Sequence, residues 1–254
     1  MVIFILGGDG LLGKRLCENL KSLKKISVFS ITKKNYHQFK KKNCDIFINA
    51  NGNSSKFIGN KNPLRDFRKS VHTTYKSLFD FNFKNYIFLS SIDVYNDDKP
   101  LNLKKENSKI DIEKINHYGF NKLISENIVK HYAKSYIILR IGTVIDSRLK
   151  KNHIFDMING KKVFVNKRSK TSLVSGEGIA KIIHLLIKKK KFNKTYNLSG
   201  KNIISYEEID NYFKLNSNFD ISKPKKIFGA NVNKLEKELK IKINTIEYLK
   251  KYLK

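Results

Sequence analysis

The sequence predicts an α/β protein built on a doubly wound parallel sheet. As far as Gly200, short runs of β-branched and aromatic residues alternate with amphipathic, helix-like stretches, which is the pattern of a parallel sheet covered by helices on both faces. The first apolar run, Val2 to Leu6, leads directly into a turn rich in glycine. A later run, Tyr86 to Ser90, ends in hydroxyl groups. The carboxyl ends of parallel strands lie along one edge of the sheet, so these two features should lie at the same edge.

The predicted elements follow one another in regular alternation. Strands are expected at Val2–Leu6, Ile26–Ile31, Asp45–Ala50, Tyr86–Ser90, Tyr136–Leu139 and Thr195–Leu198. Helices are expected after the first strand to about Leu23, in a short stretch after the second strand, and near Pro63–Phe81, His117–Tyr132 and Gly178–Ile187. The residues after Gly200 also have a helical and very basic pattern.

Charge and composition limit the class of protein. A hydrophobic content of 40 % with only 3 prolines in 254 residues indicates a globular chain. The net charge of +30 comes almost entirely from lysines spread along the whole sequence. Because a nucleic-acid interface is marked by clustered rather than total charge, we predict no nucleic-acid partner. The positive field would still attract a substrate that carries phosphates.

Membrane, disulfide and metal sites are not expected. The longest apolar runs are strand-sized and the N-terminus lacks the ordered regions of a signal peptide, so we predict a cytoplasmic protein with no membrane partner. Cys17 and Cys44 lack the spacing of a disulfide framework or a metal site. The histidines show no metal-ligand spacing either.

The glycine turn lies at a predicted strand-to-helix junction. In a dinucleotide-binding (Rossmann) fold the first glycine permits a tight turn, the second lets the backbone approach the pyrophosphate, and the third lets the helix pack on the strand. Gly7, Gly10 and Gly13 have this placement. Leu11 and Leu12 would then open the helix toward the phosphates. Alone, this motif is equally compatible with an ordinary turn.

A second signal is chemical. Tyr118 and Lys122, in the stretch HYGFNK, would project from one face of a helix about one turn apart. In so lysine-rich a chain this spacing can arise by chance. The stretch FLSSIDVY, residues 88 to 95, places Ser90 and Ser91 at a strand's carboxyl end, where a doubly wound sheet carries its chemistry.

Together these features resemble the extended short-chain dehydrogenase/reductase family of nucleotide-sugar epimerases, dehydratases and reductases. The glycine turn matches the family's G-x-x-G-x-x-G, Ser91 stands four residues before Tyr95 as in S-x-x-V-Y, and Tyr118 with Lys122 matches Y-x-x-x-K. Further similarity lies in Asp45–Gly52, Asn62–Pro63, LRIGTVID and YNLSG. The resemblance covers residues 2 to about 200.

The resemblance implies that Ser91, Tyr118 and Lys122 are catalytic. Tyr118 would exchange a proton with the substrate oxygen while hydride passes to or from a nicotinamide. Lys122 would favour the phenolate and hold the nicotinamide ribose, and Ser91 would fix the substrate oxygen. The implied cofactor-binding residues are Gly7, Gly10, Leu11, Leu12, Ser30, Thr32, Lys33, Asn49, Ala50, Asn51, Gly52, Tyr118 and Lys122.

The chain departs from the family pattern at two places. Ser30 stands where NAD-selective members carry an acid, and Thr32, Lys33 and Lys34 follow, so we expect NADP, with NAD possible. Ile92 replaces the acid that a dehydratase needs, which disfavours dehydration. The neighbouring Asp93 is interpreted either as a substrate contact or, with more weight, as a solvated turn residue. Three further candidate substrate contacts, each equally explicable as a surface polar residue, are Arg140, Asn152 and Arg168.

These observations predict an enzyme of two regions. Residues 1–145 would form an NAD(P)-binding Rossmann domain with the catalytic residues, and residues 146–254 would complete the sheet and add a small substrate-binding lobe. The predicted activity is NAD(P)-dependent hydride transfer on a nucleotide-activated sugar, either 4-keto reduction or epimerisation. The alternative is a non-catalytic Rossmann protein that binds NADP as a sensor.

A homodimer is also predicted, as in many family members, through the helices Pro63–Phe81 and His117–Tyr132. One apolar stripe of each helix must face its own sheet, so little apolar surface is expected to remain for a partner. The acids expected near this face are Asp66, Glu126 and Asp80, beside Arg65, Arg68, Lys69 and Lys76.

Overall fold

The computed structural model describes residues 1–53 and 56–253. They form two compact units. Unit 1 comprises Met1–Val94, Ile110–Arg140 and Gly176–Tyr196, and unit 2 comprises Tyr95–Lys109, Ile141–Ser175 and Asn197–Lys254. The units interleave along the chain, whereas the sequence predicts a single boundary after residue 145.

Unit 1 is built on a six-stranded sheet with the order β2-β1-β3-β4-β5-β9. Its strands are β1 (Val2–Leu6), β2 (Ser27–Ile31), β3 (Asn43–Asn49), β4 (Asn82–Ser91), β5 (Tyr136–Ile141) and β9 (Lys194–Leu198). The strand β1 pairs in parallel with both β2 and β3. The chain therefore leaves β1 in one direction and returns on its other side, which opens a crevice at the carboxyl ends of β1 and β3. The predicted doubly wound α/β fold is confirmed.

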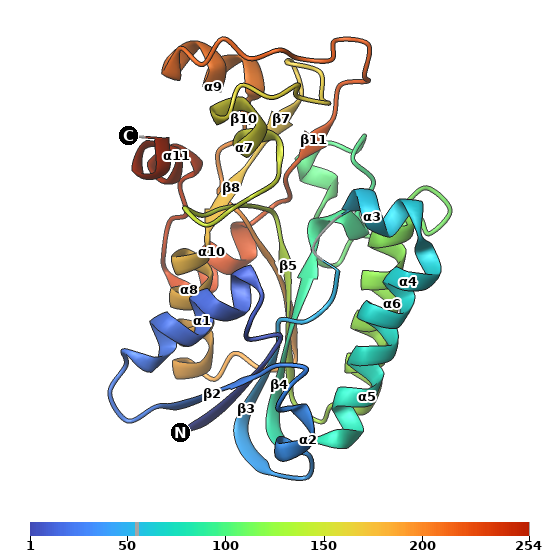
Figure 1. The fold of residues 1–254 in the computed structure, drawn as a ribbon, viewed down its shortest axis with the longest axis vertical. Helices are drawn as coiled ribbons and strands as arrows, with labels where there is room; N and C mark the ends of the chain where they lie inside the picture. The colour runs from blue at the N-terminus through green and yellow to red at the C-terminus, as the bar shows by residue number, and fades with distance from the viewer. Residues whose placement is uncertain (54–55, 254) are drawn as a thin grey trace. The chain divides into compact units, whose positions relative to one another are not determined.

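Helices cover both faces of this sheet, as Figure 1 shows. On one face α1 (Leu11–Lys21) packs against α8 (Gly176–Lys188). The other face carries α4 (Pro63–Phe67), α5 (Thr73–Asp80) and α6 (His117–Tyr132). The short helices α2 (Tyr36–Phe39) and α3 (Lys56–Lys61) precede and follow β3. None of the described helices is long and apolar enough to cross a bilayer.

The predicted helix over Pro63–Phe81 is interrupted. It begins where expected, because the Asn62 side chain accepts a hydrogen bond from the Arg65 N–H and Pro63 occupies the first helical position. A π-helical turn at Arg68–His72 then separates α4 from α5. By contrast, α6 spans the predicted residues His117–Tyr132.

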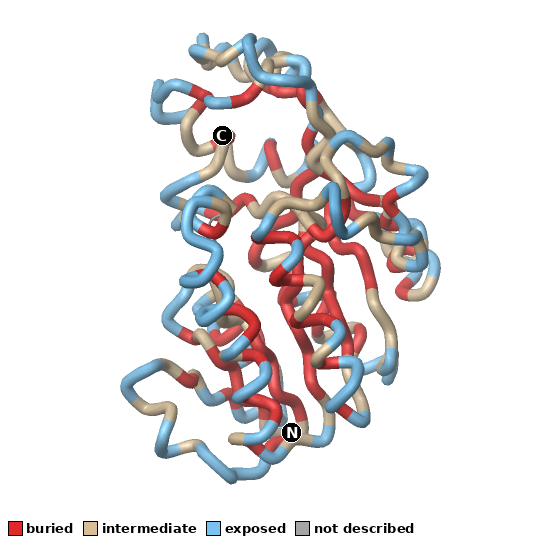
Figure 2. The backbone as a smooth tube through the Cα atoms, turned by 90° about the vertical axis from the view of Figure 1, so that its right-hand side faces the viewer, coloured by how far each residue is buried: buried red, intermediate tan, exposed pale blue. Residues whose placement is uncertain are grey.

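The core of unit 1 lies along the strands, where Figure 2 concentrates the buried residues. It includes several aromatic rings, with Phe47 stacked on Tyr86 at 5.3 Å between ring centroids. The buried Tyr86 hydroxyl is satisfied by Ser77 at 2.6 Å and by the Asn49 amide at 2.8 Å. The Tyr86 hydroxyl is therefore paired despite its burial.

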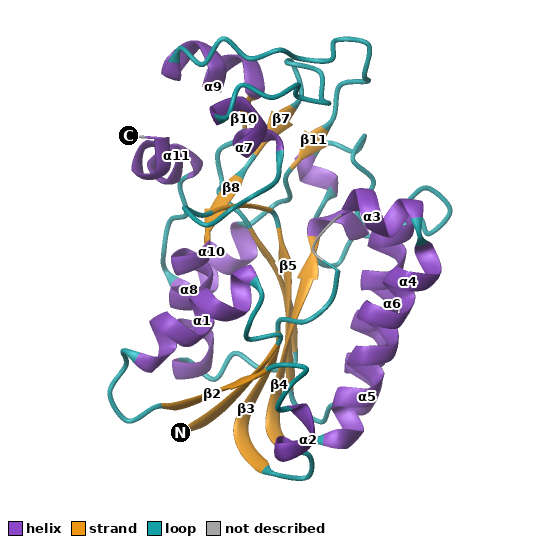
Figure 3. Ribbon diagram, viewed as in Figure 1, coloured by secondary structure: helices purple, strands orange, loops and turns teal. Residues whose placement is uncertain are grey.

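Unit 2 consists of short strands and helices joined by long loops (Figure 3). Its small sheets pair β6 (Thr143–Ile145) with β8 (Leu173–Ser175), and β7 (Lys170–Thr171) with β10 (Ile204–Ser205) and β11 (Ile227–Phe228). Its helices are α7 (His153–Ile158), α9 (Tyr206–Phe213), α10 (Asn233–Leu239) and α11 (Thr245–Leu253). The helices after Gly200 agree with the predicted pattern, while β10 and β11 were not expected.

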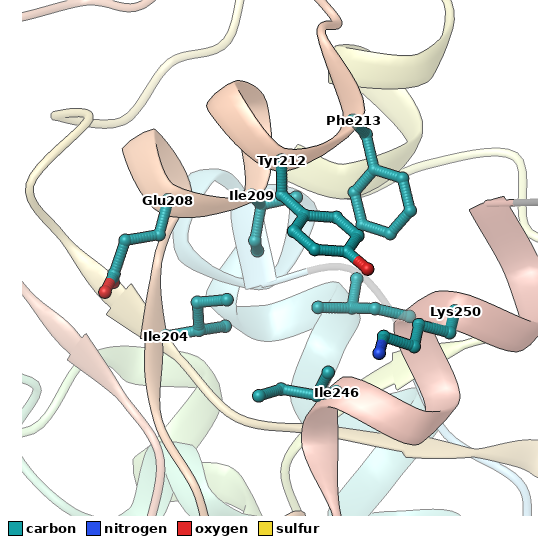
Figure 4. Close-up of a pocket in the computed structure, with 8 residues that line it drawn as sticks. Ile204, Glu208, Ile209, Tyr212, Phe213, Ile246 and Lys250 are labelled. Carbon is teal, nitrogen blue, oxygen red and sulfur yellow. The ribbon is translucent and has the colours of Figure 1, made fainter.

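A pocket of about 310 Å³ lies between α9 and α11 of unit 2 (Figure 4). Apolar side chains form most of its wall, and Glu208 is engaged in the capping box of α9 with Ser205. The lining residues are Ile204, Glu208, Ile209, Tyr212, Phe213, Ile246, Leu249 and Lys250. None of the predicted site residues is among them.

Candidate active site

The glycine turn has the geometry that a dinucleotide requires. Gly7 has a φ of +80°, and a Cβ on it would approach the Asn51 backbone to 2.9 Å, so only glycine fits there. A Cβ on Gly13 would collide with the Gly7 carbonyl. At Gly10 the only neighbour of an added Cβ is the Gly7 oxygen at 3.3 Å. The backbone before α1 is therefore open to a phosphate, and these residues fit a bound NAD(P).

The turn after β2 is held by an asparagine that the sequence analysis did not single out. Asn35 Oδ1 accepts a hydrogen bond of 2.7 Å from the Thr32 N–H, and its amide donates to the Ser30 carbonyl at 3.0 Å. Ser30 packs directly against Gly8. Lys33 is exposed beside this turn. Ser30 and Thr32 thus lie next to the glycine turn, as the predicted cofactor site requires.

The backbone of Ala50 and Asn51, directly after β3, lies against Gly7 of the glycine turn. Asn49 is fully buried; its amide donates to Thr74 and Tyr86, and its Oδ1 accepts from the Asn51 N–H at 3.0 Å. Its side chain therefore shapes the loop of Ala50 and Asn51 and is not presented to a cofactor. Gly52, with a φ of +129°, completes the loop.

Tyr118 and Lys122 lie on the first turns of α6, and several contacts fix that end of the helix. The Asn116 side chain caps it by accepting from the Gly119 N–H at 3.0 Å. Asn60 Oδ1 of α3 accepts from the Tyr118 N–H at 3.2 Å. Gly119 lies so close to the Asp93 carbonyl that a Cβ there would collide with it. A glycine inside a helical pattern is a sequence signal for such close packing.

The three predicted catalytic residues meet in unit 1. Ser91 lies near enough to Tyr118 for its hydroxyl to lower the pKa of the Tyr118 phenol. Lys122 Nζ donates to the Leu89 carbonyl at 3.0 Å and lies 3.5 Å from the position of a Cβ on Gly52. The predicted catalytic and cofactor segments are thus adjacent at Lys122 and Gly52.

Asp93 is engaged and is not the solvated turn residue that the sequence favoured. Its Oδ2 accepts from the Ser91 hydroxyl at 2.9 Å, and its Oδ1 forms an ion pair of 2.6 Å with Lys56 Nζ. Lys56 was not predicted as a site residue. The Lys56 ammonium partly neutralises the carboxylate that orients Ser91.

Burial sets the protonation of the two central groups. The pKa of Tyr118 is raised by desolvation and by the carboxylates of Asp93 and Asp66, and the Ser91 hydroxyl lowers it only in part. Burial lowers the pKa of Lys122 to about 8, against the opposing effects of Asp66, Glu126 and Asp93. The chain alone therefore keeps Tyr118 neutral and Lys122 close to half-charged at slightly alkaline pH.

Arg140 lies in an internal ion pair and not at the surface. Its side chain is 3 % exposed, and its Nη2 and Nε contact the fully buried carboxylate of Glu126 at 2.8 and 3.0 Å. The Ser90 hydroxyl donates to the same carboxylate at 2.6 Å. These bonds support a structural role for Arg140 between β5 and α6 rather than the predicted substrate contact.

The remaining candidate substrate residues belong to unit 2. Asn152 has a φ of +145° and caps α7, accepting from the Phe155 N–H at 2.8 Å and donating to the Val144 carbonyl at 3.0 Å. Arg168 is exposed in the loop before β7. Across residues 1–53 and 56–253 no group of His, Cys, Asp or Glu side chains is arranged to hold a metal ion.

Comparison with known families decides the assignment. Residues 3–199 match the profile of the NAD dependent epimerase/dehydratase family. The chain belongs to this family. The predicted resemblance to extended short-chain dehydrogenases/reductases is thereby confirmed. No curated protein sequence is significantly similar to the chain.

Solved structures share the fold over the whole chain. A dTDP-4-dehydrorhamnose reductase ortholog of Clostridium acetobutylicum has a TM-score of 0.82 at 18 % identity, covering 100 % of this chain and 98 % of its own. A mutant UDP-glucuronic acid 4-epimerase of Bacillus cereus, solved with a UDP-sugar and NAD, has a TM-score of 0.82 at 15 % identity, covering 100 % and 99 %. A dTDP-4-dehydrorhamnose reductase of Bacillus anthracis, solved with NADP, has a TM-score of 0.80 at 18 % identity, covering 99 % and 96 %.

Proposed function

We propose that this protein is an NAD(P)-dependent enzyme that reduces or epimerises a nucleotide-activated sugar. The observation that carries the proposal is the meeting of Ser91, Tyr118 and Lys122 beside Gly52, next to the open glycine turn. Both reactions occur among the similar structures, which include a dehydrorhamnose reductase and a UDP-sugar epimerase.

The chain's own residues supply proton transfer and orientation. A bound nicotinamide would supply the hydride chemistry. Ser91, oriented by Asp93, would fix the sugar oxygen beside the Tyr118 hydroxyl. Lys122 donates one N–H to the Leu89 carbonyl, and its ammonium keeps two further donors for the nicotinamide ribose. Because burial raises the pKa of Tyr118, its hydroxyl stays protonated at neutral pH and is ready to donate to a carbonyl. Reduction of a 4-keto sugar, in which this hydroxyl donates its proton to the carbonyl oxygen, is the first reaction to test.

For the cofactor we propose NADP, with NAD as the second candidate. From Ser30 to Lys34 the turn after β2 carries no carboxylate that would repel a 2′-phosphate, and Lys33 and Lys34 are exposed there. A non-catalytic NADP sensor remains the alternative function. It is less well supported, because cofactor binding alone does not require the contact between Ser91 and Tyr118.

We also propose a homodimer. The exposed face of α5 and α6, through which the two copies would associate, is more apolar than the sequence predicts. Tyr75, Phe79 and Tyr132 contact one another on α5 and α6, and each is exposed. The expectation that Asp66 and Glu126 lie at this face is wrong, since both are buried inside unit 1. A second copy of the chain would cover the three rings. A cytoplasmic location likewise stays a prediction of the sequence.

The proposed function is tested by mixing purified protein with NADPH or NADH and a panel of dTDP- and UDP-4-keto sugars, and by following cofactor absorbance. Tyr118→Phe should lower turnover by about 100-fold or more with cofactor affinity retained, because only the proton-transfer hydroxyl is lost. Tyr132→Phe, an exposed tyrosine on the same helix, is the matched control. Unchanged turnover in Tyr118→Phe would overturn the assignment.

A further inference from the structure

A buried carboxylate lies beside the catalytic helix and has no part in the proton transfer described above. Asp66 on α4 is 1 % exposed. Its Oδ2 accepts a 2.7 Å hydrogen bond from the Asn121 amide of α6, and its Oδ1 accepts a longer one of 3.4 Å from Ser70. Both donors are neutral. A buried carboxylate is costly unless a positive charge lies near it, so its surroundings should contain one.

The contacts around Asp66 lead to Lys122. Ser70 Oγ, which bonds Asp66, lies 3.4 Å from the position of a Cβ on Gly52, and Lys122 Nζ lies 3.5 Å from that same position. A Cβ on Gly59 would lie 3.3 Å from the Asp66 carboxyl carbon and 3.2 Å from Tyr118 Cβ. Asp66 thus lies in the packing between α3, α4 and the start of α6. Within the described part of the chain no cation forms a direct ion pair with it.

Three carboxylates act on the charge of Lys122, those of Asp66, Glu126 and Asp93. They differ in whether another cation already forms an ion pair with them. Asp93 is paired with Lys56, and Glu126 is paired with Arg140. Tyr118, one turn earlier on α6, is neutral. Asp66 is the one of the three carboxylates whose charge is not taken up by another cation among residues 1–53 and 56–253. It also has the largest effect of the three in holding up the pKa of Lys122 against burial.

We propose that Asp66 is a positioning residue that keeps Lys122 positively charged and ties the start of α6 to α4. The inference rests on the proposed role of Lys122 in holding the nicotinamide ribose. An ammonium with its charge retained offers three N–H donors, whereas a neutral amine offers fewer and attracts the anionic cofactor less. The hydrogen bond from Asn121 to Asp66 holds α6 against α4. The negative charge of the Asp66 carboxylate stabilises the charged form of Lys122.

The test measures the titration of Lys122 in the protein without added cofactor. Competitive labelling with trace acetic anhydride over a range of pH, quantified peptide by peptide, gives the midpoint of each lysine. The wild-type midpoint of Lys122 should be about 8. In Asp66→Asn, which keeps the shape and the contact with Asn121, the midpoint should fall below the wild-type value, because the carboxylate that raises the pKa of Lys122 is lost. The alkaline limb of kcat/KM should move down with it.

The matched control is Asp80→Asn on α5. Asp80 pairs with Lys40 and Tyr36, which lie outside the site, and its loss should leave the Lys122 midpoint unchanged. If Asp66→Asn does not fold, Asp66→Ser removes the same charge and takes its place in the same measurement. An unchanged Lys122 midpoint in the folded variant overturns the inference. Full turnover in Lys122→Met overturns the proposed function instead, so the two failures are distinguishable.

Discussion

The ion pair of Glu126 with Arg140 allows a quantitative test of what Arg140 does. Arg140→Met would leave the fully buried Glu126 carboxylate with Ser90 as its remaining partner in this group. Breaking a buried pair by removing one partner costs about 3–5 kcal/mol, because the other charge stays buried. For a chain of this size that corresponds to a melting temperature lower by roughly 6–20 °C.

The assay is thermal unfolding followed by circular dichroism, together with KM for the sugar nucleotide. If Arg140 has a structural role, Arg140→Met should lose much of its stability, while the KM of the protein that remains folded should be unchanged. The double variant Arg140→Met, Glu126→Leu should recover most of the loss, since an apolar pair of similar volume is often as stable as the ion pair. The matched control is Lys84→Met, because Lys84 pairs with Asp45 while its side chain is 76 % exposed, and it should cost less than about 1 kcal/mol. An Arg140→Met protein with wild-type stability and a raised KM would refute the reasoning and restore Arg140 as a substrate contact.

Three further predictions follow from the site and from the helix face. Since the pKa of Lys122 is lowered to about 8, its ammonium loses its proton as the pH rises through that value. The value of kcat/KM should therefore fall above about pH 8. The variant Lys122→Arg should remove this fall at alkaline pH, whatever its effect on the maximal rate. Gly119→Ala should destabilise the protein by more than about 1 kcal/mol in urea unfolding, because its Cβ meets the Asp93 carbonyl; a neutral effect would mean that α6 shifts freely. Tyr132→Lys should convert a dimer to a monomer in light scattering at tens of micromolar protein, because a cation would disrupt the exposed rings; a monomeric wild type would contradict the dimer.

The parts of the fold that depend on local chemistry could be predicted from the sequence. The glycine turn is fixed by steric demands within a few residues, and Gly7 and Gly13 meet them. The helix carrying Tyr118 and Lys122 spans the predicted residues His117–Tyr132, and the Asn116 side chain caps its start. The family follows from such local motifs taken in order.

The parts that depend on distant partners could not be predicted. Charged residues are expected at the surface, so the burial of Asp66, Glu126 and Arg140 has no local signal. Asp66 is buried because Asn121, far along the chain, donates to it. Arg140 is buried because its partner is on another element. The helix face is more apolar than expected because Tyr75, Phe79 and Tyr132 are exposed on it.

The order of the chain has a consequence for its synthesis. The helix α1 packs against β1, β2 and α8, and α8 begins only at Gly176. At ribosomal speeds of about 5–20 residues per second, roughly 10–30 s separate the appearance of the two helices. During that interval the side of α1 that packs against α8 lacks its native cover. A chaperone that binds exposed apolar segments should therefore bind the nascent chain at α1, before unit 1 is complete.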